Sequence, residues 1–163
     1  MDTNNKEFVA ILDNIRSLLN VGSIFRTAEA LGFQKIYLGG ITPAPDNEKH
    51  KRLIHKTALG AEEYLPWEKV SQTFRILKKI KAEGYYLIAL ELGKGSVKIN
   101  EFKYLPSSYQ KVALLVGNEV NGINKRYLNY CDKILEIPLS GKKESLNVSV
   151  AFGVGAFWLK NLK

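Results

Sequence analysis

The stretch FVAILDNIRSLLNVGSIFRTAEALGFQKIYLG, residues 8–39, decides the fold class of this chain. Residues 8–12 form a short apolar run typical of a buried strand. Residues 21–31 then carry apolar side chains at helical spacing, with Asn20 as the expected N-cap and Gly32 as the expected stop. A second strand, KIYLG, follows directly. The stretch therefore predicts one strand–helix–strand unit.

The same alternation of strands and helices continues to the end of the chain. We expect a basic loop over residues 49–56, a helix from Pro66 to Gly84, strands over 85–92, 112–116 and 133–137, a short helix near 124–130, and a terminal helix from about 146 to 160. Parallel strands need a connecting element between them, so this pattern predicts an α/β fold with a mostly parallel sheet and helices on both faces. No linker divides the chain, and we expect one domain over residues 1–163.

The charge balance of the chain favours an anionic partner. Twenty-four Lys and Arg residues against sixteen Asp and Glu leave a formal net charge of +8, which suits nucleic acid but also many ordinary basic proteins. The N-terminus has no apolar run of signal-peptide length, and the single cysteine, Cys131, cannot form an intramolecular disulfide. We therefore expect a cytoplasmic protein. The longest uncharged stretch, residues 145–159, is too short to span a membrane, so no membrane segment is expected.

Arg26 lies nearly opposite the apolar stripe of the first predicted helix, so it faces away from the core of the domain. An exposed arginine of this kind has two interpretations. It is either an ordinary solvated side chain or an anion-binding group, because guanidinium binds phosphate bidentately and stays charged. Its position in the sequence does not decide between them.

The stretch LLVGNEVNGIN, residues 114–124, predicts a strand, a turn-rich loop and the start of a helix, which is where α/β proteins bind ligands. Gly117 and Gly122 have the spacing of a P-loop, but Ile and Asn follow them in place of Lys and Ser or Thr. Glu119 would also repel phosphates, so we reject a nucleoside triphosphate site here. The chain contains no GxGxxG motif, which argues against nicotinamide and flavin cofactors. A simple turn between strand and helix is the alternative interpretation.

The stretch IPLSGKKESLNVSVA, residues 137–151, predicts a strand end, a polar loop and the start of the terminal helix. Ser145 is placed to cap that helix. Asn147 falls in the first turn of an otherwise apolar helix, where a buried amide needs hydrogen-bond partners. It either bonds to nearby backbone or contributes to a site.

The terminal helix is apolar nearly all round, so it needs cover on two sides. Leu146, Val150, Val154 and Phe157 share one side of it. In a domain of this size, a second copy of the chain is the expected cover, and we predict a homodimer.

Metal and hydrolase chemistry are not indicated. His50 and His55 do not share a helical face and have no cysteine nearby, so we expect no metal site. No Ser-His-Asp, Cys-His or HExxH pattern is present. The basic residues near these histidines instead suggest contacts to phosphate.

Taken together, the three Gly-, Asn- and Ser-containing stretches resemble the three motifs of the SpoU or TrmH-like branch of the SPOUT methyltransferases. The first motif is carried by Asn20, Gly22, Ile24, Arg26, Thr27, Ala28 and Gly32, the second by Gly117, Asn118, Glu119 and Gly122, and the third by Ile137, Pro138, Gly141, Ser145, Leu146, Asn147 and Ala151. Their order along the chain is the order of the family.

The resemblance implies a C-terminal trefoil knot, an obligate homodimer and S-adenosylmethionine bound by the knot loops, residues 114–124 and 137–147. It implies methyl transfer to a ribose 2′-hydroxyl of tRNA or rRNA, without a metal because the sulfonium already makes the methyl group electrophilic. The implied cofactor-binding residues are Leu115, Val116, Gly117, Asn118, Gly122, Ile137, Leu139, Ser145, Leu146 and Asn147. Leu139 stands where many relatives have methionine.

The resemblance also assigns catalytic roles to five residues. Arg26 matches the arginine to which the family assigns activation of the 2′-hydroxyl. Because guanidinium is a poor base at neutral pH, we expect Arg26 to orient the adjacent phosphate and to stabilise alkoxide charge. Asn20 and Glu119 are expected to shape the pocket, and Ser145 and Asn147 to fix the loop and the substrate ribose.

No separate RNA-binding domain is expected beside this one, so the domain itself must contact RNA or recruit help. The candidate phosphate contacts are Lys49, Lys51, Arg52, Lys56, Lys125, Arg126, Lys142 and Lys143. Two alternatives stay open: a knotted RNA-binding protein that has lost methyl transfer, and an enzyme that methylates a base. The Ser-Leu-Asn run of the third motif favours the ribose-methylating branch.

Overall fold

The computed structural model describes residues 6–162. Its strands are β1 (Glu7–Asp13), β2 (Lys35–Gly39), β3 (Trp67–Val70), β4 (Tyr86–Leu90), β5 (Val97–Lys98), β6 (Lys111–Val116) and β7 (Lys133–Glu136). Its helices are α1 (Leu18–Ala30), α2 (Glu48–Ala58), α3 (Ala61–Tyr64), α4 (Thr73–Ala82), α5 (Lys125–Leu128) and α6 (Val148–Lys160), with a 3₁₀ turn, η2 (Ile99–Glu101).

The strands form one seven-stranded sheet in the order β3-β2-β1-β6-β4-β7-β5, and every pairing in it is parallel. This confirms the predicted α/β class and parallel sheet. In the centre, Leu12 of β1 is in register with Leu38 of β2 on one side and Val116 of β6 on the other. Strand order specifies neighbours and not threading, so the trefoil knot stays a prediction.

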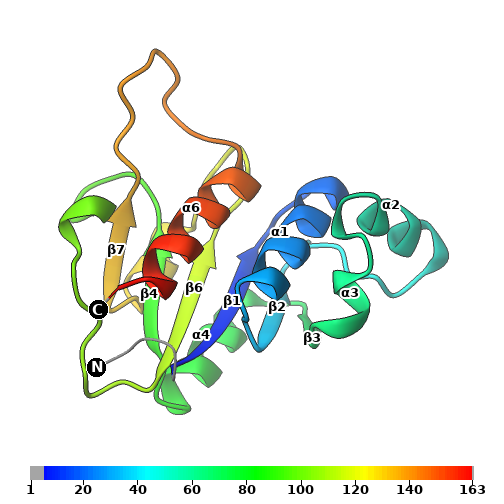
Figure 1. Cartoon of the computed structure of the whole chain (residues 1–163), viewed down its shortest axis with the longest axis horizontal. Helices are drawn as coiled ribbons and strands as arrows, with labels where there is room; N and C mark the ends of the chain where they lie inside the picture. Colours follow the sequence, from blue (N-terminus) through cyan, green and yellow to red (C-terminus); the bar gives the residue numbers. More distant parts are fainter. Residues whose placement is uncertain (1–5, 163) are drawn as a thin grey trace.

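Helices cover both faces of the sheet, as Figure 1 shows, with α1 and α6 in front and α4 behind. The alternation of side chains along each strand supplies both cores. Leu12 and Leu114 pack in the cluster that includes Phe25 of α1 and Phe152 of α6. Leu115, the next residue along β6, packs with Leu77 of α4 in the cluster on the opposite face.

The order in which strands join the sheet reverses between β1 and β6: β2 and β3 lie on one side of β1, and the later strands lie on the other side. The connection after β1 passes through α1 on one face, whereas α5, after β6, packs with the cluster on the other face. Adjacent parallel strands whose connections leave toward opposite faces leave a crevice at their carboxyl ends, and ligands bind there in α/β proteins. The fold thus places the loops after β1 and β6 side by side.

One predicted element was wrong, and another was confirmed only in part. Residues 49–56 are helical within α2 and not a loop, because Asn47 caps the helix by accepting a hydrogen bond from the His50 N–H at 3.0 Å. The helix predicted from Pro66 to Gly84 is confirmed as α4 (Thr73–Ala82), but its first residues form β3, which pairs with β2 through Ile36 and Trp67. Here a tertiary strand pairing overrides a local helical pattern.

The predicted helix caps were also displaced. The N-cap of α1 is Ser17, whose Oγ accepts from the Asn20 N–H at 3.2 Å, so Asn20 lies inside the helix. The N-cap of α6 is Asn147 and not Ser145. Gly32, with φ +72°, follows the end of α1 as predicted. The elements predicted near 8–12, 35–39, 85–92, 112–116, 124–130, 133–137 and 146–160 are confirmed within a few residues.

Gly22 lets α1 and α2 pack closely. A Cβ atom at this position would lie 2.2 Å from the Ile54 carbonyl oxygen and 2.2 Å from Thr57 Oγ1. Thr57 Oγ1 donates to the Leu19 carbonyl at 2.8 Å, so the neighbouring atoms are already fixed by a hydrogen bond. The glycine of the first motif is therefore required by helix packing. Among residues 6–162, no helix is long and apolar enough to cross a membrane.

We predict that Gly22→Ala lowers the free energy of unfolding by about 1–3 kcal/mol, because overpacking against backbone outweighs the better helix propensity of alanine. Denaturant titration at one fixed protein concentration measures the change. Gly141→Ala is the matched control, since nothing lies within 4 Å of a Cβ there. Equal stability of Gly22→Ala and the wild type would contradict this packing argument.

Candidate active site

A cleft opens at the carboxyl edge of the sheet. Three segments bound it: residues 90–92 at the end of β4, the region 116–122 after β6, and the segment that leads from Ile137 into α6. Of the predicted cofactor-binding residues, its lining includes Val116, Gly117, Asn118, Gly122, Ile137, Leu139, Ser145 and Leu146. The second and third motifs therefore share one cleft, although Gly122 and Ile137 are 15 positions apart in the chain.

The loop after β6 is folded tightly on itself. Asn118 Oδ1 accepts from the Val120 and Asn121 N–H groups at 3.0 and 2.9 Å, and Asn118 Nδ2 donates to the Asn14 carbonyl at 2.7 Å. A Cβ on Gly117 would lie 2.5 Å from the Ile123 nitrogen, so only glycine fits this close approach. The conformation of the loop is thus set by residues of the second motif.

Glu119 connects this loop to the start of α1. Its carboxylate accepts hydrogen bonds from the Arg16 N–H at 3.0 and 3.1 Å and from the Ser17 N–H at 3.0 Å. These groups belong to the loop after β1, so the carboxylate bridges the crevice between β1 and β6. An anion in this place also suits the N-terminal end of a helix.

The protonation of Glu119 follows from these contacts. Burial alone would raise the pKa of its carboxyl group, but the N–H donors of Arg16 and Ser17, with the Asn20 side chain, outweigh burial. The pKa therefore lies below its usual value of 4.5. Glu119 is ionised at neutral pH, and its charge is committed to holding α1.

A line of side-chain hydrogen bonds joins all three motifs. Asn20 Nδ2 donates to Glu119 Oε1 at 3.3 Å, and Asn20 Oδ1 accepts from Asn147 Nδ2 at 3.1 Å. Each Asn20 atom thus has the partner that its chemistry requires, which fixes the orientation of the amide. Asn147, Asn20 and Glu119 come from α6, α1 and the loop after β6, and the fold brings them into one network.

Asn147 has a second task at the start of α6. Its Oδ1 accepts from the Ser149 N–H at 2.9 Å and from Ser149 Oγ at 2.6 Å. The local backbone bond and the site contact, which were alternatives in the sequence, therefore coexist in one side chain. Asn147 lies beside the cleft, whereas Ser145 lines it.

Arg26 is exposed on α1. Within the described residues 6–162, no hydrogen bond or ion pair engages its guanidinium. It follows Asn20 by six residues, which corresponds to about 9 Å along the helix axis. Arg26 thus places a positive charge on α1, the helix that also carries Asn20 of this network. Its guanidinium is free to bind an anion.

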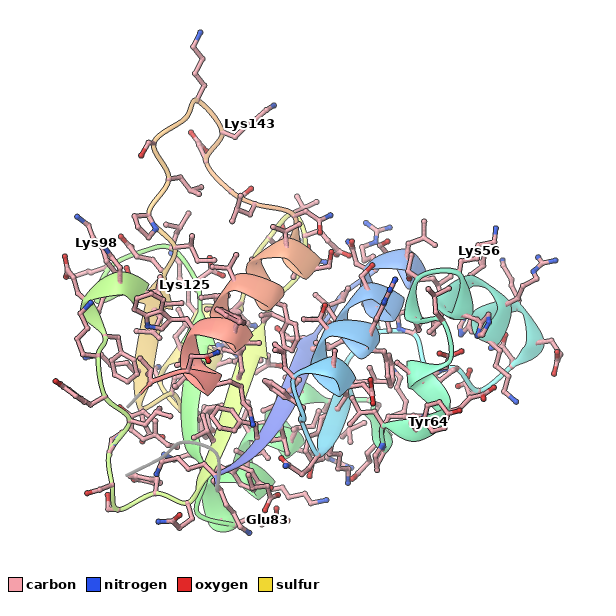
Figure 2. The ribbon with its side chains drawn as sticks, viewed as in Figure 1. Lys56, Tyr64, Glu83, Lys98, Lys125 and Lys143 are labelled. Carbon is pink, nitrogen blue, oxygen red and sulfur yellow. The ribbon has the colours of Figure 1, made fainter. Side chains whose placement is uncertain are left out.

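The predicted RNA-contacting residues are all exposed, but they lie in three places. Lys49, Lys51, Arg52 and Lys56 are on α2, Lys125 and Arg126 are on α5, and Lys142 and Lys143 are on the loop before α6. Figure 2 shows Lys56 on α2 at one end of the molecule and Lys143 on the loop that protrudes above the sheet.

Some predicted and actual lining residues differ. The structure places Leu115 fully buried on the face that packs against α4, away from the cleft. Conversely, Leu90, Glu91 and Leu92 line the cleft and were not predicted. Their signal in the sequence was the carboxyl end of a buried parallel strand, where α/β proteins place ligand contacts. Val148 and Ala151 of α6 complete the apolar wall.

The charge of the cleft restricts its ligand. Among the described lining residues, Glu91 and Glu119 are ionisable and no lysine, arginine or histidine is present. Phosphate-rich ligands need cations or a free helix N-terminus, and here Glu119 occupies the N-terminal end of α1. The cleft suits a ligand with apolar surface, hydrogen-bond donors and positive charge. Among residues 6–162, no cluster of three His, Cys, Asp or Glu side chains could hold a metal ion.

We predict that Glu119→Gln destabilises the fold by about 1–2 kcal/mol at neutral pH, since it removes charge-assisted hydrogen bonds. Because the folded-state pKa lies below 4.5, the wild-type advantage is present above that pH and is lost as the pH falls through the lowered pKa. Denaturant titrations at neutral pH and at a series of lower pH values, until the difference between wild type and Glu119→Gln disappears, measure the loss. Glu63→Gln, at an exposed position on α3, is the control and should change neither value.

Comparison with known proteins agrees with the family that the three motifs resemble. The model of the SpoU rRNA Methylase family matches residues 7–157. An uncharacterized tRNA/rRNA methyltransferase of Borreliella burgdorferi is 30% identical over 153 residues, which cover 94% of this chain and 63% of that protein. The tRNA (guanosine(18)-2′-O)-methyltransferase of Aquifex aeolicus is 29% identical over 94% of this chain and 69% of that enzyme.

A solved structure agrees in fold. The AdoMet-bound rRNA methyltransferase from Sinorhizobium meliloti superposes with a TM-score of 0.84 at 27% identity, over 98% of this chain and 58% of that one. This chain spans 58–69% of the length of the first three curated relatives. Sequence, fold and motif geometry together lead to one conclusion: this chain belongs to the SpoU rRNA methylase family.

Proposed function

We propose that this chain transfers the methyl group of S-adenosylmethionine to a ribose 2′-hydroxyl of tRNA or rRNA. The observation that carries the proposal is the Asn147–Asn20–Glu119 line, which assembles the three motifs around one cleft. The Aquifex relative is named as a tRNA 2′-O-methyltransferase and a Xanthomonas relative as a 23S rRNA 2′-O-methyltransferase. Their names support the same reaction class here.

The cleft fits S-adenosylmethionine as its ligand. The molecule is cationic at its sulfonium and ammonium groups and carries several hydroxyl and amine donors, which suits a cleft with two carboxylates and no basic side chain. Residues of the loop after β6 and the apolar side chains of Ile137, Leu139 and Leu146 would hold it. When bound, it supplies a methyl group that the sulfonium has already made electrophilic.

Arg26 is proposed to orient the RNA. The reaction needs a 2′-oxygen whose proton is leaving, and a guanidinium cannot accept that proton at neutral pH. Arg26 instead binds the adjacent phosphate and stabilises the negative charge that develops on the oxygen, while the proton passes to phosphate or water. Ser145 and Asn147 are proposed to fix the loop and the ribose, and Asn20 and Glu119 to set the shape of the pocket.

RNA is proposed to meet the basic side chains of α2 and of the loop before α6. Both sets are exposed, and among residues 6–162 no ion pair engages them, although Glu48, Glu62 and Glu63 line the same hollow as Lys49, Lys51 and Arg52. Phosphate-backbone contacts of this type supply most non-specific affinity for nucleic acid. Lys125 and Arg126 lie on α5, which packs on the other face of the sheet. We also propose a cytoplasmic location, because the single cysteine needs no oxidising compartment.

Digestion of labelled RNA tests the proposed reaction. The protein is incubated with methyl-labelled S-adenosylmethionine and undermodified total RNA, and the RNA is then digested to nucleosides. We expect label in 2′-O-methylnucleosides. Label in a base would contradict ribose methylation, and absence of label with intact cofactor binding would favour a binding protein without transferase activity.

We predict that Arg26→Ala lowers the methyl-transfer rate by on the order of a hundredfold, because one preorganised electrostatic donor is removed. The affinity for S-adenosylhomocysteine should not change, since Arg26 does not line the cleft. Single-turnover kinetics and calorimetry measure the two quantities. Arg75→Ala, on α4 at the opposite face, is the control, and equal rates for both variants would contradict the role of Arg26.

We propose that the chain is a homodimer through the outer face of α6. Val150, Val154 and Phe157 are exposed on this helix, and Leu19 of α1 and Leu146 extend the same apolar set. The helix packs against α1 and lies over the sheet on its other sides, so among residues 6–162 this face of α6 is the one that lacks cover. A second copy presents the same apolar face, which is the condition for a two-fold interface.

We predict that Phe157→Glu converts the dimer to a monomer, because a charge would be buried in an apolar interface. Phe157 is 60% exposed in the single chain, so the substitution costs the monomer little. Light scattering after size-exclusion chromatography gives the mass. Tyr64→Glu, at a 78% exposed aromatic on α3, is the control, and a wild-type monomer at micromolar concentration would contradict the proposed interface.

A further inference from the structure

Glu91 is a carboxylate in the cleft that the motifs do not account for. It follows β4 directly, and its N–H donates to the Leu135 carbonyl of β7 at 2.9 Å. The backbone is therefore fixed by the sheet. Its side chain lines the cleft, and no ion pair engages it within the described part of the chain.

Each oxygen of Glu91 accepts one backbone hydrogen bond. Oε2 accepts from the Ile123 N–H at 2.7 Å, and Oε1 accepts from the Leu92 N–H at 3.0 Å. A Cβ on Gly122, which has φ +67°, would lie 2.4 Å from Oε2. The carboxylate thus occupies the space that a side chain at position 122 would fill, and it fastens the end of the loop after β6.

These contacts leave part of the carboxylate available to a ligand. An ionised carboxylate offers about four acceptor sites, and two of them are used. The cleft contains no basic side chain that could take the others. A bound molecule with hydroxyl donors would complete the set.

The order of the strands indicates which end of the ligand Glu91 meets. The Asn147–Asn20–Glu119 line lies on the β1 side of β6, on the helix that carries Arg26, and the methyl group must face the RNA there. Glu91 lies on β4, on the other side of β6. It is therefore placed to meet an arm of the ligand that extends from the sulfur away from α1, and of the two arms the nucleoside is the one that carries vicinal hydroxyl donors.

We propose that Glu91 binds the vicinal ribose hydroxyls of S-adenosylmethionine while it fastens the loop after β6. This inference rests on the function proposed above. Vicinal hydroxyls are good donors to one carboxylate at the end of a parallel strand. One side chain then links ligand binding to the conformation of residues 117–123.

Calorimetry with S-adenosylhomocysteine tests the contact without relying on turnover. In Glu91→Gln, an amide oxygen can still accept from Ile123, but the charge and an acceptor are lost. We expect the affinity to fall by about ten- to a hundredfold, as for loss of hydrogen bonds to a charged group. Glu83→Gln is the matched control, because Figure 2 shows Glu83 at the opposite edge of the molecule.

A ligand pair identifies the partner groups. Wild-type protein should bind adenosine more tightly than 2′,3′-dideoxyadenosine, whereas Glu91→Gln should bind the two equally. Equal fractional loss for both nucleosides in Glu91→Gln would show that only the loop is disturbed, and it would overturn the proposed contact.

The controls separate this inference from the proposed function. If the wild type binds S-adenosylhomocysteine and Glu91→Gln binds it equally well, the role of Glu91 is overturned and the proposed methyl transfer stands. If the wild type does not bind S-adenosylhomocysteine, the proposed function is contradicted, and the role of Glu91 with it.

Discussion

The carboxylate of Glu119 bridges the crevice at the centre of the sheet, and the site depends on this one contact. It accepts N–H groups of Arg16 and Ser17 from the loop after β1, although it belongs to the loop after β6. The Asn118 side chain also joins these loops by donating to the Asn14 carbonyl, but Glu119 is the contact that reaches the start of α1. With it, Asn20 is held where it also reaches Asn147, and the start of α6 is tied to α1.

The parallel sheet explains why such a contact is possible. In the order β3-β2-β1-β6-β4-β7-β5, all strands point the same way, so loops from distant parts of the chain share one edge. The connections after β1 and β6 leave toward opposite faces and open the crevice. Glu91 and Glu119 then lie on either side of β6 and both line the cleft. Their carboxylates suit a cationic methyl donor and not a nucleoside triphosphate.

Much of this arrangement could be predicted from residues alone. The strand–helix alternation predicted the fold class, because the apolar runs of the strands and the helical spacing of apolar residues both reflect burial in the core. The resemblance of the three motifs predicted the family, and these motifs lie in the three segments that the fold brings together. By contrast, α2 was missed because only Ile54 and Ala58 of its residues are buried, which leaves little apolar pattern. β3 was missed because its pairing with β2 is a tertiary contact. Glu91 lies at the end of a predicted strand, but its contact could not be predicted, since its partner Ile123 lies 32 residues away.

The three motifs act as one unit, and a double-mutant cycle on Asn20 and Asn147 tests whether they do. Asn147→Asp keeps the cap of α6 but loses the amide donor to Asn20, and Asn20→Ala removes the acceptor. The affinity for S-adenosylhomocysteine is measured for both single variants and for the double variant. We expect losses that are not additive, with a coupling of about 0.5–3 kcal/mol. Additive losses would show instead that the motifs contribute separately.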